Sequence, residues 1–212
     1  MKASRGFTLI ELMVVMSIMV TMMAFSRPMI SALVGSNSVN KAISDLSCTL
    51  EEARAYAMAN NTYVNVGFGT TANSPSNPTP SFVVLCLYSI DGTINASAAS
   101  DLASNAKWLA IGRTLVLNNF NFNDALGTSS DATPATTDIP AFTRAVGNLG
   151  VVNFSGCIQF SPRGTARVQV ASPARFIKVA LDQSAPMNGK NPFVIRMGGL
   201  TGAIEILRKE NL

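Results

Sequence analysis

An acidic residue inside an apolar segment is the clearest chemical signal near the N-terminus. Glu11 lies in the run FTLIELMVVMSIMVTMMAF at 7–25, in which 15 of 19 residues are apolar. On membrane-insertion scales an unpaired acid there costs about 2.5–3.5 kcal/mol. If the chain were cut between Gly6 and Phe7, Phe7 would carry a free α-amino group, which the Glu11 of a neighbouring copy could neutralise as the helices pack. The pattern therefore predicts Glu11 as an assembly residue.

The apolar run is long enough to hold this acid in a membrane, because a helix needs about 20 apolar residues to cross a bilayer. Lys2 and Arg5 precede the run and keep the N-terminus cytoplasmic, and Pro28 follows it. A secretory signal peptide would need a small-residue cleavage site, but the chain reads SRPMISALVG after Phe25, without a clear A-x-A. An uncleaved signal anchor has no use for Glu11, although it remains the alternative.

Residues 6–12, GFTLIEL, together with the apolar run and Pro28, resemble the N-terminal signal of type IV pilins and type II secretion pseudopilins. The glycine, the aromatic residue after it, the acid at the fifth position of the cleaved chain and the proline at the twenty-second all agree. The resemblance implies cleavage after Gly6 by prepilin peptidase, N-methylation of Phe7, a single pass through the inner membrane with the C-terminal domain outside the cytoplasm, and assembly with other pilin or pseudopilin subunits into a fibre.

The remaining chain predicts an α+β fold in which a long N-terminal helix packs on an antiparallel sheet. Apolar residues from Val39 to Ala57 recur at helical spacing, and Asn60-Asn61 is a plausible stop. From Thr62 onward, seven or eight short strands are expected, for example at 81–88, 107–117 and 157–160.

We expect a leader at 1–6, a transmembrane or fibre-core helix at 7–28, an amphipathic helix at 29–61 and a β-rich domain at 62–212, with long loops at 70–80, 95–106 and 127–137. Pro28 would allow a kink between the two parts of the helix.

Weaker motifs resemble the GspH/FimT group of minor pilins and pseudopilins. They are LEEARAYAMANNTYVNVGF at 50–68, IQFSPRGTARV at 158–168 and FVIRMGGLTGAIEILR at 193–208. The resemblance implies a minor structural subunit and not a major pilin, whose C-terminal disulfide-closed loop is not apparent here. It leaves open whether the fibre secretes proteins, moves the cell or takes up DNA.

Some members of that group serve DNA uptake, and the charge distribution is compatible with a DNA contact. From Pro140 to the C-terminus there are nine basic and three acidic residues, although the whole chain carries only +4. Arg163 and Arg167 are the candidate phosphate contacts. The alternative, which we favour, is that these basic side chains are simply solvated, because only 7% of residues are aromatic and stacking partners for bases are scarce.

Three cysteines, Cys48, Cys86 and Cys157, have no metal-binding or C-x-x-C spacing. In an oxidising compartment a Cys86–Cys157 disulfide with Cys48 free is one expectation, and three buried thiols are an equally good one.

Nothing in the sequence predicts catalysis or a cofactor. The chain has no histidine, which excludes His-based triads and His metal sites, and it shows no G-x-S-x-G motif, phosphate loop or cluster of carboxylates. We therefore expect neither an enzyme nor a metal site. A signal-anchored protein of another activity is the alternative.

Overall fold

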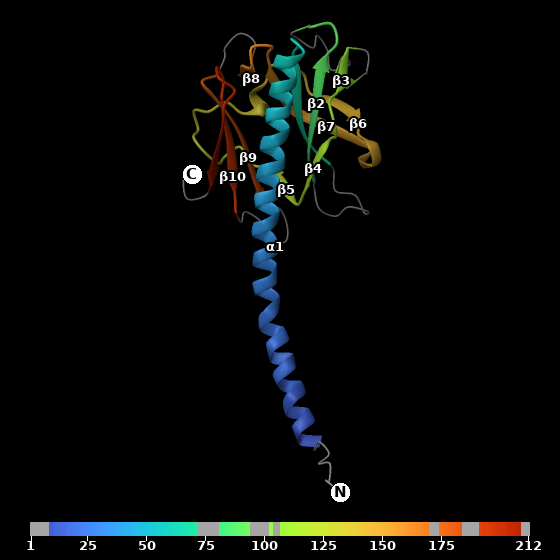
Figure 1. Ribbon diagram of the computed structural model, residues 1–212, viewed down its shortest axis with the longest axis vertical. Coiled ribbons are helices and arrows are strands. Elements are labelled where there is room, and N and C mark those ends of the chain that lie inside the picture. The colour runs from blue at the N-terminus through green and yellow to red at the C-terminus, as the bar shows by residue number, and fades with distance from the viewer. Residues whose placement is uncertain are drawn as a thin grey trace. The chain divides into compact units, whose positions relative to one another are not determined.

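A 51-residue helix, α1 (Leu9–Ala59), begins the described part of the chain and crosses the boundary between two compact units, Met1–Asn40 and Lys41–Leu212. The computed structural model describes residues 9–71, 81–93, 102–103, 107–169, 174–183 and 191–208. The second unit contains the end of α1 and all of the described strands (Figure 1).

The end of α1 packs through a single apolar stripe. Ala42, Ile43, Leu46, Leu50, Ala53 and Ala57 are buried, and the intervening polar side chains are largely exposed, as expected for an amphipathic helix. The helix stops at the predicted Asn60-Asn61. Asn61 adopts a left-handed conformation with φ 50°, and the Thr62 amide donates to the carbonyl of Ala57 at 3.1 Å. Asparagine tolerates this backbone region, so the pair provides a C-terminal cap.

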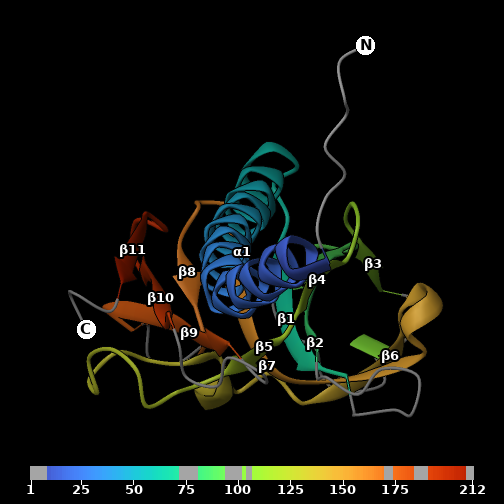
Figure 2. The ribbon, with the colours of Figure 1, turned by 90° about the horizontal axis from the view of Figure 1, so that it is seen from below.

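Two antiparallel sheets make up the rest of the second unit. The first sheet has the order β3-β2-β1-β7-β6, with β4 also paired to β2 and β8 to β7. The second has the order β11-β10-β9-β5. Figure 2 shows the two sheets on either side of the end of α1. The strands of the first sheet are β1 (Val64–Thr70), β2 (Ser81–Ser89), β3 (Trp108–Ala110), β4 (Leu115–Asn118), β6 (Phe142–Ala145), β7 (Val151–Phe160) and β8 (Ala166–Arg167); those of the second are β5 (Phe120–Phe122), β9 (Phe176–Gln183), β10 (Phe193–Gly198) and β11 (Ile204–Arg208).

Strands β1 and β2 of the first sheet are buried on both faces. Strand β2 is apolar at almost every position rather than at alternate ones, which is the pattern of a strand covered on two sides. On the face towards α1, the ring of Tyr88 contacts that of Tyr56 of the helix, with centroids 5.2 Å apart and the planes tilted by 49°. On the opposite face, the side chains of Val83, Leu85 and Leu87 contribute to a second apolar cluster.

This second cluster, which we call the far core, is centred on the fully buried Trp108. Phe142 and Phe154 stack within it at 4.9 Å between centroids. Leu102 also belongs to it, so the connection between β2 and β3 helps to close this face of the sheet. The described residues thus bury two apolar layers, one on each side of the first sheet.

The predicted α+β class, with an N-terminal helix and antiparallel sheet, is confirmed. Most of the loops predicted at 70–80 and 95–106 lie outside the described residues. The segment 127–137 contains a 3₁₀ turn, η1 (Pro134–Thr136), and an isolated parallel bridge between Ala132 and Ile177. A second 3₁₀ turn, η2 (Gly147–Leu149), precedes β7.

Candidate functional site

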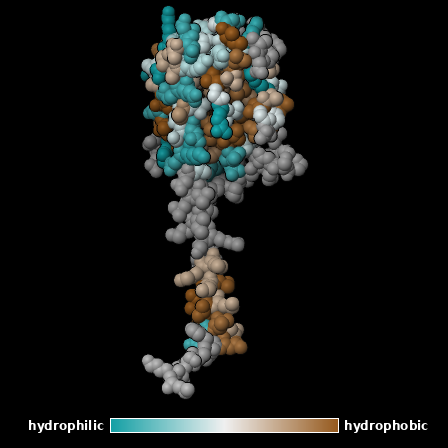
Figure 3. Space-filling view, turned by 45° about the vertical axis from the view of Figure 1, so that its right-hand side comes forward, coloured by the Kyte–Doolittle hydropathy of each residue, from teal (hydrophilic) through white to brown (hydrophobic). Residues whose placement is uncertain are grey.

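The first part of α1, from Leu9 to Met23, presents a continuous apolar surface. Every side chain in this segment is exposed, and Figure 3 shows the surface as predominantly hydrophobic. Leu9 is 80% exposed and Met23 72% exposed. An apolar surface of this extent is unfavourable in water.

The few polar side chains of this segment are arranged to suit apolar surroundings. The hydroxyl of Ser17 donates to the carbonyl of Val14 at 2.8 Å, and that of Thr21 donates to the carbonyls of Ser17 at 3.0 Å and Ile18 at 2.8 Å. Because both hydroxyl donors are satisfied by the helix's own backbone, they can lie in a bilayer or a helix bundle without an external partner.

Glu11 is exposed and lies in the first turn of α1, where the helix dipole favours a negative charge. The predicted cleavage pair, Gly6 and Phe7, lies outside the described residues. Pro28 lies within the span of α1. In the described part of the chain, no helix has the combination of length and apolarity that defines a membrane span.

Cys86 and Cys157 are both buried, and both are free thiols. The expected disulfide between them is therefore not formed, for a reason that lies in the sheet register. Cys86 of β2 pairs with Val66 of β1, whereas Cys157 of β7 pairs with Gly67. The two thiols are thus separated by a whole strand, and because they pair with consecutive residues of β1 they project from opposite faces of the sheet. Cys48 is exposed on α1, and it is also a free thiol.

Arg163 and Arg167 are placed differently. Arg163 is exposed in the turn after β7, whereas Arg167 of β8 is half-buried. The Arg167 guanidinium donates to the Oε1 of Gln159 at 2.8 Å and lies over the ring of Tyr63, 5.4 Å from its centroid. Burial lowers the pKa of Arg167 from its usual value. The structure therefore leaves only Arg163 of this pair fully presented to solvent.

Other basic residues of the C-terminal half are also used inside the fold. Arg144 is buried and donates to the carbonyls of Leu102 at 3.0 Å and Trp108 at 3.2 Å, which ties the edge of the far core to β6. Lys178 is buried and donates to the carbonyl of Leu126 at 2.7 Å. A third, Arg196, pairs with the buried Asp131 at 2.8 Å. Much of the positive charge seen in the sequence thus serves to anchor loops.

A residue that sequence reasoning missed connects the three motifs that resemble the GspH/FimT group. Arg54, near the end of α1, donates from Nε to the carbonyl of Gly164 at 3.2 Å and from Nη2 to that of Thr201 at 2.5 Å. Gly164 lies in the turn between β7 and β8, and Thr201 in the turn between β10 and β11. Arg54 therefore joins the helix to both sheets. In the sequence, Arg54 follows Glu51 and Glu52 and lies off the apolar stripe of the helix, so it looked like an ordinary solvated residue.

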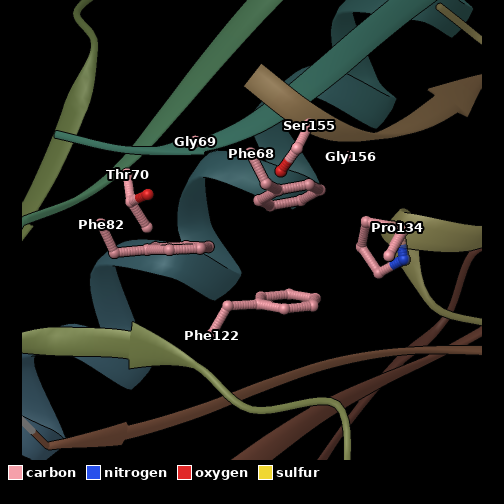
Figure 4. A pocket seen from close by; sticks show the side chains of 9 residues that line it. Phe68, Gly69, Thr70, Phe82, Phe122, Pro134, Ser155 and Gly156 are labelled. Atoms are coloured by element: carbon pink, nitrogen blue, oxygen red, sulfur yellow. The ribbon is translucent and has the colours of Figure 1, made fainter. Parts of the chain in front are cut away.

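The second feature that the sequence did not reveal is a small aromatic cavity. Its volume is about 60 Å³, and its walls come from β1, β2, β5, β7 and η1. The rings of Phe68, Phe82 and Phe122 form a stack, with centroids 5.9 Å and 6.1 Å apart along it. Figure 4 shows these rings in nearly parallel planes, with Pro134 facing them and Ser155 above.

Among the described residues there is no group of three or more side chains suited to holding a metal ion.

Comparison with known proteins identifies the N-terminal segment. Residues 1–26 match the family model described as the prokaryotic N-terminal methylation motif, which is the signal of type IV pilins and pseudopilins. The match confirms the resemblance inferred from Gly6, Phe7 and Glu11. No curated protein and no solved structure matches the chain.

Proposed function

We propose that the protein is a minor pilin or pseudopilin: a structural subunit of a type IV pilus or of a type II secretion fibre. The methylation motif at 1–26 carries this proposal, because it supports a pilin-like chain that prepilin peptidase processes. In the proposed pathway, the peptidase cuts between Gly6 and Phe7 and the new α-amino group of Phe7 is methylated. The processed subunit is anchored in the inner membrane with its C-terminal domain outside the cytoplasm, and it then assembles with other subunits into the fibre.

The exposed apolar surface from Leu9 to Met23 supports the assembly step, because lipid can cover it before assembly and neighbouring helices can cover it afterwards. Glu11 would then neutralise the Phe7 amino group of a neighbour. Pro28 would let the helix adjust its course as subunits pack, since proline removes one backbone hydrogen bond from a helix interior.

The GspH/FimT subtype is supported by the resemblance of three motifs, at 50–68, 158–168 and 193–208. We do not extend the proposal to DNA binding, because Arg144, Arg167, Lys178 and Arg196 are engaged within the fold. A phosphate-tracking face needs several cations free to replace counterions. Of the two candidate phosphate contacts, only Arg163 is exposed.

The proposal is tested by mass spectrometry of the membrane-extracted protein. We expect a chain that begins at Phe7 and is heavier by one methyl group. Gly6→Val should leave the precursor uncut, because a side chain would then stand at the scissile bond. Ala3→Val adds a similar side chain to the leader away from the cut, and it should be processed normally. An intact N-terminus on the wild-type chain, or a cut beyond Ala32, would contradict the proposal.

A further inference from the structure

The junction that Arg54 makes with the two sheets also contains a methionine. Met58 lies one helical turn after Arg54 on α1, so the two side chains lie on the same face of the helix. A Cβ on Gly164 would lie 2.7 Å from the Sδ of Met58 and 3.4 Å from the Nε of Arg54. The sulfur and the guanidinium therefore both pack against the same glycine, in the turn between β7 and β8.

Of the two methionines that the structure describes in the second unit, only Met58 is accessible to solvent. Met58 is 43% exposed, whereas Met197 of β10 is completely buried. Oxidation of a thioether requires contact with the oxidant, so susceptibility follows exposure. Met58 is thus an accessible thioether at the place where the helix is joined to both sheets.

We propose that Met58 is an oxidation-sensitive modification site, and that its sulfoxide loosens the Arg54 junction. The oxidant is a peroxide. A lone pair of the Met58 sulfur attacks one peroxide oxygen, so that an S–O bond forms while the O–O bond breaks. The sulfur loses two electrons, the peroxide gains them, and hydrogen peroxide thereby leaves as water once the proton has moved to the displaced oxygen. Methionine sulfoxide can be reduced again by enzymes, so the modification is reversible.

The position of Arg54 explains why this oxidation would reach the rest of the unit. Its Nε donates to the carbonyl of Gly164 at 3.2 Å, and its Nη2 donates to that of Thr201 at 2.5 Å. A sulfoxide oxygen is a polar acceptor, and beside a guanidinium it competes with these two carbonyls for the same N–H donors. The oxidised side chain also loses its apolar contact with Gly164, because a polar group is better solvated in water. The inference concerns the folded second unit alone, and it stands or falls separately from fibre assembly.

The test uses the full chain in lipid nanodiscs, treated with hydrogen peroxide under native conditions. Peptide mass spectrometry locates the added oxygen atoms, and urea unfolding followed by near-ultraviolet circular dichroism measures stability. We expect Met58 to be converted while Met197 remains unmodified. The equilibrium constant for unfolding should rise about 5–30-fold, the effect of weakening one or two hydrogen bonds from a charged donor.

Two variants separate Met58 from the other oxidisable residues and from a general loss of packing. Met58→Leu keeps an apolar side chain of similar volume that cannot be oxidised, so peroxide should leave its unfolding curve unchanged. Every other methionine and every cysteine is still present in this variant, so the comparison with the wild type isolates Met58. In Arg54→Ala the contacts that the sulfoxide disturbs are already lost, so peroxide should shift its unfolding curve much less than that of the wild type.

Three results would overturn the proposal. The first is a Met58 that stays unmodified in the folded protein. The second is an equal shift of the unfolding curve in the wild type and in Met58→Leu. The third is a shift in Arg54→Ala as large as that in the wild type, which would show that the sulfoxide does not act through the junction.

Discussion

Arg54 lies 3.2 Å from the carbonyl oxygen of Gly164 and 2.5 Å from that of Thr201, measured from its Nε and Nη2 atoms. These two carbonyls belong to turns of different sheets, so one side chain holds the helix and both sheets together. Arg54 also forms an ion pair with Glu51 at 3.5 Å. Both side chains are partly exposed, and ion pairs of this kind contribute little to the free energy of unfolding.

Replacing Arg54 should therefore destabilise the second unit. We expect Arg54→Ala to lower the free energy of unfolding by about 1–3 kcal/mol, because hydrogen bonds from a charged donor are lost. Glu51→Ala is the matched control and should change it by less than about 1 kcal/mol. Urea unfolding of the full chain, followed by near-ultraviolet circular dichroism, measures both. Equal effects of the two substitutions would show that the carbonyl contacts contribute nothing.

The same junction gives a prediction for Gly202. Its φ is +65°, and a Cβ there would collide with the carbonyl oxygen of Gly164 and lie 2.6 Å from Arg54 Nε. Gly92 has a similar φ of +71°, but a Cβ there would meet no atom of the described residues within 4 Å. Gly92→Ala should thus cost only the left-handed backbone penalty of about 1–2 kcal/mol. Gly202→Ala should cost about 1–3 kcal/mol more, from the steric clash. Thermal unfolding of the two variants gives the difference, and similar melting temperatures would refute the close approach.

The buried thiols predict a particular pattern of chemical labelling. Burial raises the pKa of Cys86 and of Cys157 to about 12, from an ordinary value of 9.0. The thiolate is the reactive form, so at pH 8 a maleimide should modify only Cys48 in the folded protein and all three cysteines in urea. Mass spectrometry counts the labels, and Cys48→Ser should give none in the folded state. Labelling of Cys86 without unfolding would contradict this description.

The same two thiols make stability depend on pH at the alkaline end. In the unfolded chain they release their protons near pH 9, whereas in the folded protein they hold them to about pH 12. The folded state therefore binds more protons in this window, and the free energy of unfolding should fall as the pH rises from about 9 to about 12. Urea titrations across this range should show a smaller decline for a Cys86→Ala, Cys157→Ala double variant than for the wild type.

Glu11 provides the prediction on assembly. Glu11→Ala should leave membrane levels unchanged or higher, because an acid is removed from an apolar surface. It should also prevent incorporation into fibres, because the neighbouring Phe7 amino group would then be buried without a counter-charge. Glu11→Gln should be nearly as poor, since an amide cannot neutralise an ammonium. The measurement compares membrane and sheared-fibre fractions beside the wild-type system. Normal incorporation of both variants would favour the simple signal anchor.

The sequence predicted the second half of α1 and its end well. The buried apolar stripe runs to Ala57 at helical spacing, and Asn60-Asn61 follows it directly. Strands were predicted less accurately where inward positions carry polar residues. The strand β6 was missed because Arg144 occupies one of its inward positions, next to Trp108. The stretch 107–117 was read as one strand, but Gly112, with φ +58°, separates β3 from β4.

The site was predictable only where its residues are neighbours in the chain. The N-terminal motif is contiguous, so Gly6, Phe7 and Glu11 could be recognised together. The aromatic cavity collects Phe68, Phe82, Phe122 and Pro134 from separate elements, and no spacing in the sequence connects them. The failed Cys86–Cys157 pairing has the same origin, because the strand order and register decide which buried side chains meet.

The far core makes β2 a wall shared by two apolar layers. On one face Val83, Leu85 and Leu87 pack in the layer that contains Trp108, and on the other face Tyr88 contacts Tyr56 of α1. Because protein interiors are close-packed, a substitution that moves β2 in one layer also disturbs the other layer.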